Sequence, residues 1–225
     1  MGGQAGGDVA SRLVMDSLAE LAPTLGGIAS APDLHEEERA TDRLTTMAEQ
    51  AHASILTHAA QHPPLYGMGT TLVMAHLLPL PKPRLLVLNV GDSRAYLVRA
   101  GTLTQLTRDH TLIEEYVRDG RLTPTQAACH PNRHVLTRAM GLAPHLESDL
   151  FFFDLLDGDL LLLCSDGLTK MLTDERILQT VRPHQDIPSL ATQALIHTAL
   201  DAGGLDNVTV VACTITEIPD QANIH

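Results

Sequence analysis

The chain has 225 residues, of which 44% are hydrophobic and 19% charged, a balance typical of one soluble globular domain with a sizeable core. Its 15 basic and 27 acidic residues give a formal net charge of −12, which argues against nucleic acid or an anionic membrane surface as a partner. No signal peptide or membrane-spanning apolar stretch is evident, and the three cysteines form no CxxC pair. We therefore expect a cytoplasmic protein.

The N-terminal third is predicted to be helical. A glycine-rich opening, Gly2–Gly7, is expected to form a loop, and residues 8–22 then carry apolar side chains at roughly helical spacing. Residues 36–60 repeat apolar side chains every three or four positions, which predicts a long amphipathic helix. The helix is expected to lie at the protein surface, and we predict no zinc site among the histidines on or beside it: His52, His58 and His62.

From residue 70 onward, β-rich runs predict strands, at 70–78, 84–90, 94–98, 102–106, 149–155, 159–164 and 207–215. Residues 111–141 lose this alternation and are expected to form short helices and loop. Further helices are predicted near 174–182 and at 187–201. Because the helices come in blocks and do not alternate strictly with strands, the pattern favours an α+β layered fold over a doubly wound one.

Three short acidic motifs follow or precede apolar runs that are predicted to be buried strands. They contain Asp92 in Gly-Asp-Ser-Arg, Asp166 in Ser-Asp-Gly, and Asp206 in Gly-Gly-Leu-Asp-Asn. A carboxylate at the end of a buried strand is costly unless a cation meets it. Oxygen ligands alone favour Mg²⁺ or Mn²⁺ over zinc. The three aspartates are therefore candidate ligands for a hard metal ion.

Each aspartate also has a simpler interpretation. Asp92 is predicted at the tip of a hairpin, where it could cap its own backbone. Asp166 could be the N-cap of the next helical turn, and Asp206 alone is an ordinary turn signal. These alternatives remain open on the motifs taken one by one.

Taken in order, the motifs resemble the bacterial type 2C, metal-dependent protein serine/threonine phosphatases. The resemblance runs from residue 1 to about 215, and the ordered set is far more specific than any single motif. Its members are Met1-Gly2-Gly3 with Gly6, Gly69-Thr70-Thr71, residues 89–96, residues 106–111, His130-Pro131 with residues 135–141, Ser165-Asp166-Gly167-Leu168, and Asp206-Asn207-Val208-Thr209.

The resemblance implies a four-layer α-β-β-α sandwich with a metal centre at one end. Asp166 and Asp206 would hold two Mn²⁺ or Mg²⁺ ions, Asp92 would join Asp166 at a third ion, and Gly2 and Gly3 would lie in the loop beside the metals. Residues 109–135 would form a flap within a catalytic domain spanning 1–216, followed by a polar tail, 217–225. A metal-activated water would hydrolyse phosphoserine and phosphothreonine in proteins, with no catalytic side chain beyond the metal ligands. A Ser/Thr kinase would be a natural partner.

The sequence departs from the family at its start. In the family an Asp-Gly pair, with a metal-bridging aspartate, precedes Met1-Gly2-Gly3, and opening strands lie further upstream. We therefore expect an N-terminally incomplete fold that binds metal weakly and turns over little by itself. The competing hypothesis is an inactive phosphatase-like module that binds phosphoproteins or a partner kinase. Retention of Asp92, Asp166 and Asp206 favours the enzyme.

Overall fold

The computed structural model describes residues 3–25, 35–78 and 82–216 of the chain. They fall into two compact units that interleave along the sequence. The first unit comprises residues 1–72, 88–92 and 109–150. The second comprises residues 73–87, 93–108 and 151–225.

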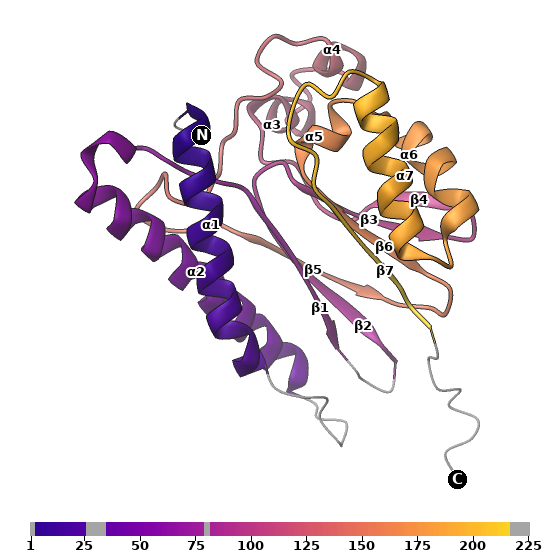
Figure 1. Ribbon diagram of the computed structural model, residues 1–225, viewed down its shortest axis with the longest axis horizontal. Coiled ribbons are helices and arrows are strands. Elements are labelled where there is room, and N and C mark those ends of the chain that lie inside the picture. Colours follow the sequence, from indigo (N-terminus) through magenta and orange to yellow (C-terminus); the bar gives the residue numbers. More distant parts are fainter. Residues whose placement is uncertain (1–2, 26–34, 79–81, 217–225) are drawn as a thin grey trace. The chain divides into compact units, whose positions relative to one another are not determined.

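A pair of helices, α1 (Gly3–Leu21) and α2 (Glu36–Gln61), dominates the first unit, and the two lie side by side (Figure 1). The predicted amphipathic pattern of α2 is confirmed, because its buried residues recur every three or four positions: Ala40, Leu44, Met47, Ala48, Ala51, His52, Ile55 and Ala59. The short 3₁₀ turns η1 (Ala22–Leu25) and η2 (Pro63–Leu65) follow the two helices.

From Gly3 onward the glycine-rich opening is helical and does not form the predicted loop. Gly2 and Gly3 were both expected in a loop beside the metals. Gly3 is instead the first residue of α1, and Gly2 lies outside the described residues. Glycine weakens a helix by about 1 kcal/mol relative to alanine, which is why the sequence favoured a loop. Packing overrides that preference here: Gly6, Ala10 and Val14 form one buried stripe at four-residue spacing.

The rest of the first unit contains two short helices, α3 (Leu112–Arg118) and α4 (Pro124–Ala128), as expected for this region. Each begins at a threonine N-cap. The Thr111 side chain accepts a hydrogen bond from the Glu114 N–H, and the Thr123 side chain accepts one from the Gln126 N–H.

An antiparallel sheet of order β4-β3-β6-β7 forms the centre of the second unit: β3 (Arg94–Arg99), β4 (Thr102–Gln105), β6 (Leu160–Cys164) and β7 (Val210–Thr214). The helices α6 (Asp174–Val181) and α7 (Pro188–Asp201) cover one face of this sheet (Figure 1). Their buried residues share a core with Tyr96, Val98, Leu160 and Leu162. The single turn α5 (Asp166–Thr169) follows β6, and η3 (Arg182–His184) follows α6.

A second core lies on the other face of this sheet. There Ala95, Leu97 and Leu161 share a cluster with Leu85 and Val87 of β2. Strand β2 (Arg84–Val90) belongs to a second sheet, of order β1-β2-β5, with β1 (Leu72–Leu78) and β5 (Asp149–Asp154). The second unit is thus layered as helices, sheet and sheet. The predicted α+β class is confirmed, with helices in blocks and two separate sheets.

The predicted hairpin around Asp92 is wrong. Strands β2 and β3 are consecutive in the chain, but they pair in different sheets. Residues 91–93 therefore form a crossing between sheets. The sequence could not distinguish the two cases, because both strands are apolar on both faces and Gly91, with φ +105°, would suit a hairpin turn equally well.

Candidate metal centre

Asp166 lies where β6 ends and the single turn α5 begins. Ser165 occupies the N-cap position of α5, so Asp166 is the first residue of the turn and not its cap. The Ser165 hydroxyl makes no capping bond. It donates to the Asn207 carbonyl at 3.2 Å and accepts from the Thr209 N–H at 3.0 Å. These contacts tie the end of β6 to the segment that leads into β7.

That segment carries Asp206, and Gly167 allows it to approach α5. A Cβ atom built on Gly167 would overlap the Asn207 carbonyl, so only glycine fits at this position. One oxygen of the Asp206 carboxylate, Oδ1, accepts the Asn207 N–H at 2.9 Å. The other oxygen, Oδ2, is left to face a cation.

The cation that it faces is Lys170. The Lys170 Nζ lies 2.6 Å from Oδ2 of Asp166 and 2.9 Å from Oδ2 of Asp206. The three side chains are about one quarter to one half exposed, at 26%, 33% and 45% for Lys170, Asp166 and Asp206. The structure therefore brings the two predicted ligands together around one positive charge.

Electrostatics in this trio follow the contacts. Burial opposes the charge on Lys170, but the hydrogen bonds to both carboxylates outweigh burial and raise the pKa of Lys170. The hydrogen bond from Lys170, followed by the one from the Asn207 N–H, lowers the pKa of Asp206. Both groups are therefore held in their charged forms at neutral pH.

The donor set suits a hard divalent ion. Lys170 is a stand-in cation, since its single ammonium reaches one oxygen of each carboxylate. A metal ion at the same place would meet the oxygen ligands that Mg²⁺ and Mn²⁺ prefer. Within residues 3–25, 35–78 and 82–216, however, no three His, Cys, Asp or Glu side chains are gathered as a metal-binding group.

The third predicted ligand, Asp92, belongs to the first unit, whereas Asp166 and Asp206 belong to the second. Asp92 follows Gly91, which three contacts fix. The His110 N–H donates to the Gly91 carbonyl at 3.0 Å, and the Gly91 N–H donates to Nδ1 of His110 at 3.1 Å. The Asn89 side-chain amide also donates to the Gly91 carbonyl, at 3.2 Å. The residue before Asp92 is thereby held rigidly.

The His110 ring also contacts the Asp149 carboxylate, which is itself paired with the Arg138 guanidinium. Its Nε2 lies 3.4 Å from Oδ2 of Asp149, and the other oxygen of Asp149 accepts from Arg138 at 2.8 Å. Burial lowers the pKa of His110, while Asp149 acts in the opposite direction. For Asp149 burial would raise the pKa, but contacts with His110 and Arg138 outweigh it and keep that pKa below its usual value. His110 is thus a neutral acceptor for the Gly91 N–H.

His52 belongs to the helix that the sequence places at the surface, but its side chain is buried, with 4% of its area exposed. Its Nδ1 accepts the Gly141 N–H at 3.1 Å, and its Nε2 lies 2.9 Å from the Ala143 carbonyl. Gly141 has φ +84°, and a Cβ there would overlap Ile55. His52 falls within the apolar stripe of α2, between Ala48 and Ile55, but a histidine in such a stripe does not by itself indicate burial.

A model of the Protein phosphatase 2C family matches residues 1–201 of this sequence. The chain belongs to the protein phosphatase 2C family. It shares 39% identity over 222 residues with the serine/threonine protein phosphatase PstP of Mycobacterium tuberculosis, covering 96% of this chain and 39% of PstP. The chain therefore spans about two-fifths of that relative's length.

Two further comparisons, one with another relative and one with the PstP catalytic domain, are covered more completely. The serine/threonine phosphatase stp of Listeria welshimeri is 34% identical over 211 residues, which is 94% of this chain and 80% of stp. The crystal structure of the catalytic domain of PstP in complex with two manganese ions superposes with a TM-score of 0.77 at 37% identity. That match covers 96% of this chain and 85% of the other chain.

Two of the motifs shared with the family are structural. Thr70 and Met140 form an isolated bridge, in which each N–H donates to the other's carbonyl, at 3.2 and 2.9 Å. A Cβ on Gly69 would lie 2.6 Å from the Met140 carbonyl, so glycine is required beside the bridge. These contacts position the chain around Gly141.

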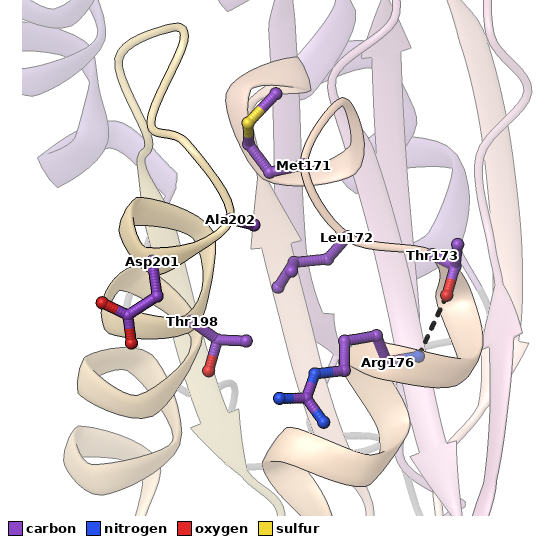
Figure 2. A pocket seen from close by; sticks show the side chains of 7 residues that line it. All are labelled: Met171, Leu172, Thr173, Arg176, Thr198, Asp201 and Ala202. Carbon is purple, nitrogen blue, oxygen red and sulfur yellow. Dashed lines mark hydrogen bonds between the residues drawn. The ribbon is translucent and has the colours of Figure 1, made fainter.

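A separate pocket of about 420 Å³ opens between α6, α7 and the connection after α5. Figure 2 shows Arg176 on α6 and Asp201 on α7 among its walls. Neither Asp166 nor Asp206 lines it. Its walls nevertheless include Met171, the residue that follows Lys170, so the pocket is lined by the segment that leads away from the candidate metal centre.

Sequence reasoning missed Lys170 and the role of His110. A signal existed for Lys170, which follows Asp166 by four residues and so returns to the same side of a helical turn. His110 stood in a recognised motif, but nothing in the sequence indicated that its ring would accept a backbone N–H.

No helix among the described residues is long and apolar enough to cross a membrane.

Proposed function

We propose that this protein hydrolyses phosphoserine and phosphothreonine esters in proteins and that Mn²⁺ or Mg²⁺ is its cofactor. The observation that carries the proposal is the meeting of Asp166 and Asp206 at one cation, 2.6 and 2.9 Å from the Lys170 ammonium. Membership of the protein phosphatase 2C family and the two manganese ions in the PstP catalytic domain support it. Divalent metal would supply an activated water and charge neutralisation for the phosphoryl oxygens.

The chain's own residues would hold and orient that chemistry. Asp166 and Asp206 are proposed as ligands of the two ions, and Asp92 as a ligand of a third ion together with Asp166. Gly167 keeps the Asp206 segment against α5, and the two hydrogen bonds of Ser165 fix its register. His110 fixes Gly91 and thereby the backbone at Asp92. No side chain is proposed as a covalent nucleophile.

The test is hydrolysis of a phosphothreonine peptide by the protein, measured with Mn²⁺, with Mg²⁺ and with a chelator. The decisive quantity is the ratio between the metal-loaded and chelated rates. We expect Asp166→Asn to lower the metal-dependent rate at least about a hundredfold, because even residues that only orient metal ligands often cost 10–100-fold. Asp186→Asn, at an exposed aspartate in the η3–α7 connection, is the matched control and should leave the rate unchanged.

Equal rates for Asp166→Asn and wild type would contradict the assignment of Asp166. Binding of the phosphopeptide without any metal-dependent hydrolysis would favour a non-catalytic binding module instead. The chain would then recognise phosphoproteins without acting on them.

The remaining expectations extend this proposal. Phosphorylated proteins would be the substrates, and a Ser/Thr kinase that makes them would be the functional counterpart. Residues 109–135, which contain α3 and α4, are proposed as the flap beside the site. Cys129, Cys164 and Cys213 form no disulfide in the described part of the chain, which supports a reducing compartment, and on that ground we propose the cytoplasm.

A further inference from the structure

The Lys170 ammonium contacts the same carboxylate oxygen atoms that a metal ion would bind. Its Nζ contacts Oδ2 of Asp166 and Oδ2 of Asp206, the same two carboxylates that the proposed function assigns to metal. Metal–oxygen bonds are about 2.0–2.2 Å long, so an ion bound to both oxygens would coincide with the ammonium. Lysine and metal cannot hold these oxygens together.

The backbone of Lys170 is fixed, whereas its side chain is free to leave. The Lys170 N–H donates to the Asp166 carbonyl at 2.8 Å, which anchors the residue at the end of α5. The ammonium sits on a flexible four-carbon stem that is 26% exposed. It can therefore turn into solvent without any change in the main chain.

The choice of lysine is unusual for this protein. Of its 15 basic residues only Lys82 and Lys170 are lysines, and the other 13 are arginines. An arginine fork would hold both carboxylates through several rigid hydrogen bonds. A lysine ammonium is a point charge on a mobile stem, and a divalent ion displaces it more easily.

We infer that Lys170 is a built-in counter-ion of the metal centre, which holds Asp166 and Asp206 together without metal and must be displaced when Mn²⁺ or Mg²⁺ binds. The inference rests on the proposed function, since it takes the same two aspartates as metal ligands. Lys170 therefore sets the metal concentration at which the centre fills. The effect applies to every divalent ion, because the competition is for the same oxygens.

The size of the effect follows from population arithmetic. If the lysine-bridged state accounts for about nine-tenths of the metal-free protein, the apparent dissociation constant is raised about tenfold. Removal of the ammonium should therefore tighten metal binding by about that factor. Replacement by arginine should weaken binding further, because the guanidinium is harder to displace.

Calorimetric titration with MnCl₂ measures this directly. We expect Lys170→Met and Lys170→Gln to bind Mn²⁺ about tenfold more tightly than wild type, and Lys170→Arg to bind it more weakly. Lys82→Met removes the other, exposed lysine and should leave the affinity unchanged. Two neutral variants are used so that a defect peculiar to one of them does not decide the result.

Amine acylation of the wild-type protein gives a second readout that needs no substitution of Lys170. Because the chain has two lysines, peptide mapping separates Lys170 from the internal reference Lys82. Saturating Mn²⁺ should raise acylation of Lys170 several-fold and leave Lys82 unchanged. Asp206→Asn, which removes one of the two carboxylates, should raise it without metal.

The outcomes separate the two proposals. Tighter Mn²⁺ binding by the neutral variants, with metal-induced acylation of Lys170, supports the inference. Measurable Mn²⁺ binding that is the same in wild type and the neutral variants overturns it and leaves the proposed function standing. Absence of Mn²⁺ binding in every variant overturns both.

Discussion

His110 and Gly91 are joined by two hydrogen bonds that run in opposite directions, from N–H of His110 to the Gly91 carbonyl and from N–H of Gly91 to the His110 ring. The ring can accept only while Nδ1 carries no proton. His52 and Gly141 repeat the same ring contact, also at 3.1 Å. Both glycines have positive φ, so each imidazole ring holds a backbone turn that other residues rarely adopt.

This contact predicts a loss of stability at mildly acidic pH. The pKa of His110 is lowered from 6.5 in the folded protein, mainly by burial, with Arg138 acting in the same direction and Asp149 and Asp109 against it. The unfolded chain therefore takes up the proton first. The contribution of neutral His110 to the free energy of unfolding is complete above pH 6.5. It is lost as pH falls through the folded pKa of His110, at up to about 1.4 kcal/mol per pH unit.

Urea unfolding between pH 5 and 7.5 measures this loss for wild type and His110→Asn. Asparagine can offer its Oδ1 to the Gly91 N–H but does not titrate, so we expect a flatter dependence on pH in the variant. His145→Asn, at an exposed histidine, should keep the wild-type slope. Parallel curves for wild type and His110→Asn would show that His110 does not carry the effect.

Gly167→Ala should destabilise the protein, although alanine is the better helix former by about 1 kcal/mol. The added methyl would overlap backbone atoms of Asn207, which cannot move aside as the end of a flexible side chain could. We expect a lower urea midpoint and weaker Mn²⁺ binding, because the Asp206 segment is pushed from α5. Gly158→Ala, where φ is +81° but nothing lies within 4 Å, should cost stability alone.

Arg99→Met should cost about 1.5–3 kcal/mol of unfolding free energy, because the buried Asp159 carboxylate loses its cationic partner and keeps only the hydrogen bond from the Leu156 N–H. Arg99 grips both oxygens of Asp159, at 2.8 and 2.6 Å, and the Asp159 side chain is only 1% exposed. Guanidinium chloride unfolding measures the loss. Arg133→Met, at an exposed arginine, is the control and should change stability by less than about 0.5 kcal/mol.

Tyr96→Phe isolates one hydroxyl in the core of the second unit. That hydroxyl accepts from Arg94 at 2.7 Å and donates to Asp174 at 2.9 Å, and burial, the largest influence, raises the pKa of Tyr96. The direct Arg94–Asp174 ion pair, at 3.7 Å, remains in the variant. We therefore expect a loss of only about 1 kcal/mol by urea unfolding. A loss above roughly 3 kcal/mol would mean that the pair depends on the hydroxyl.

Periodicity was enough to predict most elements of the fold. The stripe of α2 and the apolar runs of β2 and β6 are strong, long signals, and their predicted bounds agree with the structure within a few residues. Strand pairing was harder, because apolar strands carry no mark of their neighbours, and β2 and β3 were wrongly joined. The helical Gly3–Gly7 segment was missed because packing on α2 outweighs its poor propensity.

For the candidate site, the motifs singled out Asp166 and Asp206, which the structure brings to one cation, and their role as metal ligands stays a prediction. The role of Asp92 stays a prediction. Lys170 was missed because a metal ion and a lysine ammonium can each neutralise a carboxylate at the end of a buried strand, and the motif does not distinguish them. His110 and His52 were missed because a buried histidine that accepts a backbone N–H depends on contacts 19 and 89 residues away in the chain.

The hydroxyl of Ser165 continues the β6–β7 ladder beyond the last paired residues, Cys164 and Val210. The amide of Thr209 should therefore exchange with solvent deuterium as slowly as amides inside the strands, although it lies outside β7. On the N-terminal side of Thr209, the Asp206 segment is held by the close approach of the Asn207 backbone to Gly167 and by the ion pair of Asp206 with Lys170. Local fraying at this end could detach Asp206 while the sheet stays intact, so the centre would open at a lower free energy than global unfolding.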